Sequence, residues 1–540
     1  MPRTRICSNE RQPNKKALAR SLVLKRILIA TVVSALIVPL GGLSPGTAGA
    51  TPPLNPKQAA PLSFPAPTWT DTIGPVALSS PTVTTLDGVP AVVFGSESGY
   101  VYAVNALTGA NLPGWPEPVD IQPGVPTAVE SSPTVAYLDG PKKPPSIIVG
   151  AGSTYIANQQ GGVVAFNANG TMRFKFLTRA VFNEWANTSI PNGYRQSVFS
   201  TPAVGDLTGR GQLDIVFGSY DHRLYALTPN GDVVPGFPVD TEDTIWSSPA
   251  LFHVRGPSKH ADDIFIGGDA SGHQGCVGGF VYDFTYVHNR PKIAWSHCED
   301  QTIWSSPAVG VINSSGSPAV VVGTGFGWKP PYQPGTDRVY AFYAKTGRSV
   351  PGWPVQTAGP AFGSPAIGVL AGSTTPAVVD TSWCLACTPT NPGDSMVYAW
   401  QGTGKRIWSQ TLLGPNDFSS PVIVDLTGSG GNDVVVGSSN GLYPLDGSTG
   451  AFLYGTDEAS GVNVASMLNA VAVAYIPGSG PGAGWHLFEA AGGPQQVTPV
   501  GRLFDYPLPA VPGTRPPWPM WRGNPAHQGV AFLTIPRLLR

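Results

Sequence analysis

Two cysteines of the chain have a spacing that could carry redox chemistry. Cys384 and Cys387 are separated by two residues and follow Trp383. Dithiol redox sites use this spacing when a helix N-terminus lowers the pKa of the first thiol. Prolines follow at positions 389 and 392, and the next element is expected to be a strand over 397–400. The segment therefore lacks the helix that a redox site needs.

We predict structural disulfides instead. Cys276 and Cys298 fall in one repeated unit of the chain, and Cys384 and Cys387 fall in another. Paired cysteines of this kind are typical of exported proteins. The sequence therefore predicts two disulfides, each within one unit.

Aromatic residues recur at one position of a repeated phrase, three residues before its proline. The residues at this position are Leu78, Glu130, Phe199, Trp246, Trp304, Phe362 and Phe418. Flat rings gathered near an axis could stack on a sugar or a peptide. The alternative, which we favour, is that each ring packs against the neighbouring unit. The five aromatic residues remain candidates for ligand binding.

The phrase itself is a Ser or Thr followed by Pro and an aliphatic run. Its prolines are Pro81, Pro133, Pro202, Pro249, Pro307, Pro365 and Pro421. Each unit contains four short runs with strand character, for example 202–206, 214–218, 223–227 and 234–239. A four-stranded sheet cannot bury both faces alone, so neighbouring copies must stack on it, which gives a β-propeller.

The units set the predicted domain organisation. Seven clear copies and a degraded eighth start near residues 79, 131, 200, 247, 305, 363, 419 and 464. We predict an all-β propeller over 64–532 with eight blades of four antiparallel strands; seven blades is the alternative. The segment 67–73 is expected to supply the outer strand of the last blade, and 533–540 is a tail.

The N-terminal 50 residues have the pattern of a secretory signal, with a basic leader, an apolar run over 27–40 and a small-residue site at 48–50. A Pro-rich linker, 51–63, follows. The rest holds 24 basic and 32 acidic residues, a net charge of −8 that disfavours a nucleic-acid partner. We expect a secreted or envelope-exposed monomer with no membrane span in the mature chain; an uncleaved N-terminal anchor is the alternative.

Two turn patterns connect the chain with known repeat families. Residues 103–115, repeated at 341–353, resemble the Ala-x-Asp-x-x-Thr-Gly-Lys-x-x-Trp repeat of quinoprotein-like propellers. The Asp- and Gly-rich turns 206–214 and 425–433 are similar to the FG-GAP repeats of integrin-type propellers. Residues 518–529 resemble a ring-closure segment of bacterial members. These resemblances imply a propeller fold and leave the activity open, because quinoprotein-like propellers include enzymes and scaffolds.

The FG-GAP resemblance implies calcium binding through aspartates at alternate positions. This chain departs from the pattern, because Arg210 and Ser429 stand where the family has a carboxylate. Asp425 and Asp433 are the candidates for a weak calcium turn. The alternative is that the aspartates only cap the turn.

The quinoprotein resemblance implies pyrroloquinoline quinone with calcium as an alternative cofactor. Enzyme members often have a disulfide between adjacent cysteines, and no Cys-Cys pair occurs here. Neither a His-Glu-x-x-His motif nor a Gly-x-Ser-x-Gly motif occurs either. We therefore predict no cofactor and keep a quinone-dependent dehydrogenase as the alternative function.

Insertions are expected on one face of the propeller, where the connections from second to third strands and from outer to next inner strands emerge. They carry Trp185, Trp328, Tyr332 and the Cys384 pair. Elaboration of one face of a rigid scaffold is typical of binding proteins. We predict a non-catalytic propeller that binds an envelope protein, a peptide or a glycan on this face; an envelope assembly scaffold is a further alternative.

Overall fold

The computed structural model describes residues 63–124, 126–153, 160–178, 197–241, 243–255, 261–269, 276, 278–325, 336–384, 394–414, 418–457, 461–462, 466–477, 482–493, 500–509 and 516–531. They belong to one compact unit, residues 59–540. The described residues form strands and turns without a helix, so none of them lies in a helix long and apolar enough to cross a membrane.

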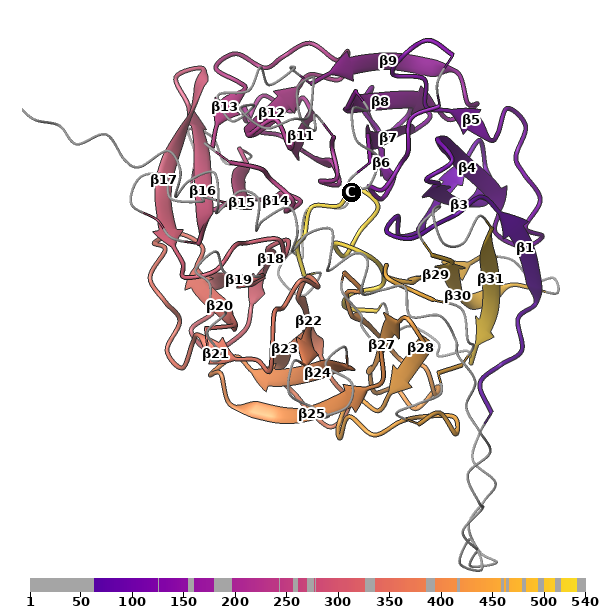
Figure 1. The fold of residues 1–540 in the computed structure, drawn as a ribbon, viewed down its shortest axis with the longest axis vertical. Helices are drawn as coiled ribbons and strands as arrows, with labels where there is room; N and C mark the ends of the chain where they lie inside the picture. The colour runs from indigo at the N-terminus through magenta and orange to yellow at the C-terminus, as the bar shows by residue number, and fades with distance from the viewer. Residues whose placement is uncertain are drawn as a thin grey trace, which may run out of the picture. The chain divides into compact units, whose positions relative to one another are not determined.

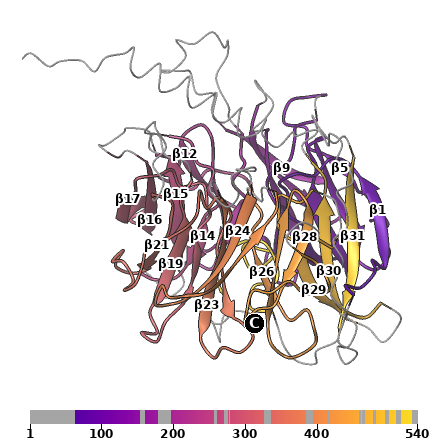
Figure 2. The same ribbon diagram turned by 60° about the horizontal axis from the view of Figure 1, so that its bottom comes forward.

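The strands form an eight-bladed β-propeller (Figures 1 and 2). Blade 1 consists of β2 (Thr82–Leu86), β3 (Val89–Gly95), β4 (Tyr100–Asn105) and β5 (Glu117–Pro118). Blade 2 consists of β6 (Thr134–Ala136), β7 (Ser146–Ala151), β8 (Gly162–Asn167) and β9 (Met172–Leu177). Blade 3 consists of β10 (Ala203–Gly205), β11 (Asp214–Gly218), β12 (Arg223–Leu227) and β13 (Val239–Asp240). Blade 4 consists of β14 (Ala250–Phe252), β15 (Asp263–Asp269), β16 (Gly279–Val287) and β17 (Arg290–Cys298).

The second half repeats this plan. Blade 5 consists of β18 (Ala308–Val311), β19 (Pro318–Gly323), β20 (Arg338–Tyr343) and β21 (Val355–Gln356). Blade 6 consists of β22 (Ala366–Val369), β23 (Pro376–Cys384), β24 (Asp394–Gln401) and β25 (Arg406–Leu412). Blade 7 has three strands among the described residues, β26 (Val422–Val424), β27 (Asp433–Ser438) and β28 (Gly441–Leu445). Blade 8 consists of β29 (Ala472–Ile476), β30 (Gly484–Ala491), β31 (Gly501–Leu508) and β1 (Trp69–Ile73).

The ring is closed by strands from the two ends of the propeller. β1 pairs antiparallel with β31, so that Trp69 is opposite Asp505 and Ile73 is opposite Gly501. Because β1 precedes blade 1 in the sequence, the first segment of the propeller completes its last blade (Figure 1).

Outer strands differ between alternate blades. In blades 1, 3 and 5 the sequence suggests the phrase Pro-Gly-aromatic-Pro as part of the outer strand, but the phrase ends at the residue directly before a two-residue strand, β5, β13 or β21. Its glycines have positive φ, as in Gly114 at 83°, which bends the chain before pairing begins. Blades 2, 4 and 6 have outer strands of six to nine residues instead.

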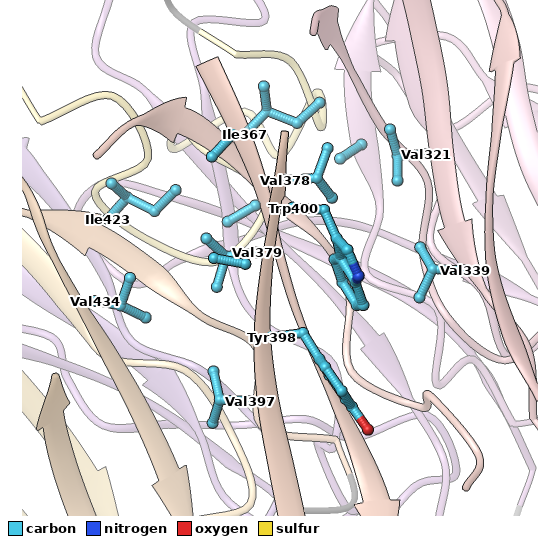
Figure 3. Packing of buried hydrophobic residues seen from close by; sticks show 14 of the residues in the cluster. Val321, Val339, Ile367, Val378, Val379, Val397, Tyr398, Trp400, Ile423 and Val434 are labelled. Carbon is cyan, nitrogen blue, oxygen red and sulfur yellow. The ribbon is translucent and has the colours of Figure 1, made fainter. Parts of the chain in front are cut away.

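The seams between blades hold the apolar core. Figure 3 shows one such region, in which Val321 and Val339 of blade 5, Val379 and Trp400 of blade 6, and Val434 of blade 7 belong to one buried cluster. The second strands are buried on both faces, as their continuous aliphatic runs predict, and they pack together with residues of the inner, third and outer strands.

Tryptophan side chains form hydrogen bonds that connect several blades to the next blade. Trp115 donates its indole N–H to the carbonyl of Ala168 at 3.1 Å, and Trp353 donates to that of Gly402 at 3.0 Å. Trp408 donates likewise to Gly447, and its ring lies against Gly450, where an added Cβ would be 2.6 Å from the ring. Glycine is required there by the ring and by its φ of 74°. The repeated Thr-Gly and Trp therefore have an inter-blade role.

Candidate functional site

The five aromatic residues singled out in the repeated phrase meet at the propeller axis. Trp246 and Trp304 stack with ring centroids 4.5 Å apart, and Phe362 stacks on Trp304 at 4.8 Å. Phe418 continues the series at 5.8 Å from Phe362, and Phe199 contacts both Phe418 and Trp246 at 5.5 Å. We call these five residues the aromatic hub. Each ring lies against a ring of another blade, which is the packing interpretation.

Burial within the hub is uneven. Trp246, Trp304 and Phe362 are buried, whereas Phe199 and Phe418 are only half-buried. The indole N–H of Trp304 donates to the buried carboxylate of Asp269 at 3.0 Å. The tryptophans are thus fixed from two sides, and a ligand at this end of the axis would meet mainly the two phenyl rings.

The equivalent positions of blades 1 and 2 hold Leu78 and Glu130. Glu130 is 2% exposed and accepts a hydrogen bond of 2.6 Å from the hydroxyl of Ser153. Both residues line a small axial pocket together with four hub rings and the hydroxyl groups of several blades. The pocket measures about 20 Å³, which is room for roughly one water molecule.

A ring of hydroxyl groups surrounds the axis next to the hub. In blade after blade, the backbone N–H of the residue before the repeated proline donates to the side-chain oxygen of the equivalent residue in the next blade. The donor and acceptor pairs are Ser80 with Ser132, Ser132 with Thr201, Thr201 with Ser248, Ser248 with Ser306, Ser306 with Ser364, and Ser364 with Ser420. We call this set the hydroxyl ring. It explains why Ser or Thr precedes each proline.

Blade 8 departs from this ring. Its equivalent residue is Ala470, whose N–H donates to Ser80 at 3.0 Å and closes the circle on that side. Alanine offers no oxygen to the N–H of Ser420. The preceding Asn469 donates to the carbonyls of Ser79 and Ala490. The repeat phrase of blade 8 therefore lies at 469–471, later than the start near residue 464 that the sequence suggests, because Asn and Ala replace Ser and Val replaces Pro.

The other end of the axis is filled by the segment 516–531, which we call the C-terminal plug (Figure 1, yellow). Its carbonyls accept backbone N–H bonds from the inner strands of six blades; the donor–acceptor pairs are Val135–Pro525, Val204–Ala526, Leu251–Gln528, Val309–Gly529, Ile423–Trp518 and Val473–Pro519. The side chain of His527 adds a contact with Thr82 of blade 1 at 3.1 Å. The plug thus ties together blades that are distant in sequence.

Arg522 is the charged centre of the plug. It is 1% exposed, and its guanidinium donates to the carbonyls of Pro249 at 2.7 Å and of Pro307. Burial lowers the pKa of Arg522 to about 9. Burial likewise lowers the pKa of His527 to about 4, so this imidazole is neutral at pH 7. Sequence reasoning flagged this segment by resemblance but did not single out Arg522.

The remaining predicted site residues are distributed as follows. Trp185, Trp328, Tyr332, Cys387 and the side chain of Cys384 lie outside the described residues. Cys276 and Cys298 form a disulfide, which joins the connection before β16 to the end of β17. The predicted second disulfide therefore stays a prediction.

The aspartate-rich turns are closed by their own backbone. Both carboxylate oxygens of Asp425 accept N–H bonds, from Gly428 at 2.8 Å and from Gly430 at 2.6 Å. Asp433 accepts from the N–H of Leu426, and burial raises its pKa to about 6. A calcium ion would have to displace these donors. In the part of the chain that the structure describes, no three His, Cys, Asp or Glu side chains gather closely enough to hold a metal ion. Calcium at Asp425 and Asp433 stays a prediction.

The axial pocket does not fit a quinone cofactor. Pyrroloquinoline quinone is a tricyclic acid, and pockets for small organic ligands have volumes of about 300–1,000 Å³. The pocket here is about 20 Å³, and hub rings in mutual contact form its wall. Binding within this pocket would require its rings to separate, so we derive no redox step through such a group.

Comparison with known proteins supports the fold and does not identify a family. No protein-family model and no curated protein matches the chain. Among solved structures, the biofilm matrix protein Bap1 of V. cholerae is similar with a TM-score of 0.52 and 13% identity, over 82% of this chain and 91% of that one. BamB of Moraxella catarrhalis gives 0.47 and 13%, over 81% and 98%, and a quinohemoprotein alcohol dehydrogenase of Pseudomonas putida HK5 gives 0.40 and 13%, over 79% and 67%. The similarity to Bap1 supports the fold and assigns no activity to this chain.

Proposed function

We propose that the chain is an exported, non-catalytic propeller that binds a macromolecule or a glycan through one face. This face, which we call the loop face, is formed by connections between second and third strands and from outer strands to the next inner strands. The observation that supports this proposal is that the connections between strands differ in length between the two faces. On the loop face the longest connections between two strands are 119–133, 178–202 and 324–337, with 15, 25 and 14 residues, whereas the longest on the opposite face, 106–116, 228–238 and 344–354, have 11 residues.

The centre of the loop face offers an apolar contact. Phe199 and Phe418 are half-buried, and their rings are 5.5 Å apart. Below them Trp246 and Trp304 are held in place by stacking and by Asp269. A rigid platform with two accessible phenyl rings suits stacking on a pyranose ring or contact with an apolar peptide side chain.

Rigidity at the rim supports the same proposal. The Cys276–Cys298 disulfide lies on the loop face of blade 4, where β15 is followed by the connection that leads to β16. A disulfide limits the conformations of the segment that it closes, and a binding surface whose loops are already ordered loses less entropy when its ligand binds. This favours recognition over a lid that must open and close.

A binding screen tests the proposal. The purified exported chain is applied to an array of oligosaccharides and to immobilised extended peptides, together with the variants Phe199→Ser/Phe418→Ser and Tyr475→Ser. Tyr475 is 54% exposed and lies at the end of β29 on the opposite face, so it is a matched aromatic control. We expect a ligand class that the wild type and Tyr475→Ser retain and the double variant loses. Binding to none of the probes, or equal loss in both variants, contradicts the proposal.

The quinone-dependent alternative has its own readout. Trp246 and Trp304 stack at the axis, so their fluorescence should report an axial ligand. We expect no saturable change when pyrroloquinoline quinone and calcium are added. Saturable quenching would overturn the non-catalytic proposal and would require a screen of alcohols and sugars as substrates.

A further inference from the structure

A strip of exposed cations follows the outer rim of blades 4, 5 and 6 on the face opposite the loop face. Each blade contributes two, at or next to the turn between its third and outer strands. They are Arg290 and Lys292 of blade 4, Lys345 and Arg348 of blade 5, and Lys405 and Arg406 of blade 6. We call these six residues the basic rim. They occupy equivalent places on three consecutive blades, which lie side by side in Figure 1.

Acidic residues do not offset this strip. From the third strand to the outer strand of these blades, over 279–298, 338–356 and 394–412, the acids are Asp283 and Asp394, and both are 0% exposed. The equivalent turns of blades 3 and 7 carry Asp232 and Asp446 instead. The chain after residue 50 has a net charge of −8, so a local excess of six cations stands out against the whole molecule.

The basic rim is not used inside the protein. Among the described residues, ion pairs join Arg173 to Asp139 and Arg255 to Asp283, but none involves a residue of the rim. Two exposed isoleucines flank the cations, Ile293 at 54% and Ile407 at 38%. The contact of Lys345 with the neighbouring blade is made by its carbonyl, which accepts from Arg255, so the charged end of its side chain is not used in that contact.

We propose that the basic rim binds an extended anionic polysaccharide. The rim follows the curved outer edge of the ring over three blades, so its six cations form a line of charges rather than one compact cluster. A flexible chain with repeated negative charges can follow three blades in succession and contact all six cations. Such binding gains from the release of counterions and weakens as salt is added. This inference rests on charge placement and does not depend on the loop face.

A charge-reversal experiment tests the proposal. The rim variant is Lys292→Glu/Lys345→Glu/Lys405→Glu, one exposed lysine per blade. The control is Lys142→Glu/Lys143→Glu/Arg502→Glu, which makes the same change in net charge at exposed residues of blades 2 and 8. The probe is linear polygalacturonate, measured by calorimetry at low salt (about 0.01 M) and near physiological salt (about 0.15 M).

We expect the wild type and the control to bind polygalacturonate, the rim variant to bind at least tenfold more weakly, and salt to weaken all binding. Thermal unfolding checks that both variants fold. The proposal is overturned if the wild type does not bind, if both variants lose affinity equally, or if neutral dextran binds as well. Preference for phosphatidylglycerol vesicles or for polyglutamate over polygalacturonate would also overturn it, by assigning the rim to a membrane or to an acidic polypeptide.

Discussion

The axis and the outer rim of this propeller use the same repeats in opposite ways. At the axis, the aromatic hub, the hydroxyl ring and the C-terminal plug make contacts between blades, and Trp246 and Arg522 are almost fully buried. At the basic rim, equivalent positions of three blades carry cations such as Lys292 and Lys405 that face solvent. The repeated residues at the axis therefore mainly hold the ring together and leave only Phe199 and Phe418 partly accessible, whereas the basic rim, present on three blades, is exposed to a partner.

Residues at the axis and at the rim should differ in their contribution to the free energy of unfolding. Each axial contact joins residues of different blades, so its loss weakens the joint between those blades. A solvated lysine on the rim contributes little to folding, since surface substitutions usually change stability by no more than about 0.5 kcal/mol. Variants at the axis should thus change stability, and variants at the rim should change only binding.

Removing the C-terminal plug should have the largest effect. Truncation after residue 516 deletes hydrogen bonds to the inner strands of six blades and the buried side chains of Trp518 and Met520. At about 1 kcal/mol per hydrogen bond and about 2 kcal/mol per buried side chain, the loss approaches about 10 kcal/mol, close to the whole stability of a typical domain. We expect the truncated chain not to fold, as measured by circular dichroism.

A point substitution tests the role of the plug in a chain that can still fold. Arg522→Met retains the apolar stem and leaves the carbonyls of Pro249 and Pro307 without their donor. We expect a loss of about 3 kcal/mol, because buried polar groups without partners are costly. If either variant unfolds at the wild-type temperature, the plug is not what holds the axis.

Within the hub, Trp246→Ala should be the next largest change. The indole stacks on Trp304 and is 6% exposed, so its removal leaves a cavity between blades. Large-to-small changes of buried aromatics cost about 3–5 kcal/mol. Guanidinium unfolding should show this loss, whereas Lys292→Ala on the rim should unfold like the wild type. Equal effects of the two variants would erase the distinction between axis and rim.

The sequence predicts the fold better than the site for reasons visible in particular residues. Eight blades follow from the recurrent Ser-Pro phrase and the aliphatic second strands, because each repeat has the same pattern of strands and turns. The hydroxyl ring was missed, because a Ser before Pro also suits a turn, and only stacking of the blades shows that Ser306 accepts from Ser248. The basic rim was missed as well, because its three pairs of cations are more than 50 residues apart in the sequence and become neighbours only through the ring. Arg522 carried no signal beyond being a lone cation in a Trp-rich segment.

Closure of blade 8 supplies a pH test of whether polar contacts outside the axis also hold the ring. His486 contacts Asp505 at 2.7 Å through Nδ1 and the carbonyl of Gly482 at 2.8 Å through Nε2, so both ring nitrogens face acceptors. Burial lowers the pKa of His486, but the hydrogen bond and charge of Asp505 and the Gly482 carbonyl outweigh it, so the pKa is raised above 6.5.

A raised histidine pKa means that the folded protein binds the proton more tightly than the unfolded chain. The contribution of His486 to stability is thus complete below pH 6.5 and is lost as the pH rises through the folded pKa. We expect His486→Gln to be destabilised by about 1–3 kcal/mol near pH 6 and to approach the wild type at alkaline pH. A pH-independent difference in urea unfolding would show that the imidazole is neutral in the folded protein.

The smallest expected effect is a gain, from completing the hydroxyl ring. Ala470 stands where seven other blades have a hydroxyl, and its N–H already donates to Ser80. Ala470→Ser would offer an oxygen to the N–H of Ser420 and should stabilise the protein by about 0.5–1.5 kcal/mol, the net value of one hydrogen bond. The converse variant, Ser306→Ala, removes the acceptor of Ser248 and should cost a similar amount or more. Thermal unfolding of both variants tests this expectation. If Ala470→Ser is destabilised while Ser306→Ala behaves as expected, blade 8 has no room for a hydroxyl at this position. The small size of Ala470 is then required by the packing of blade 8.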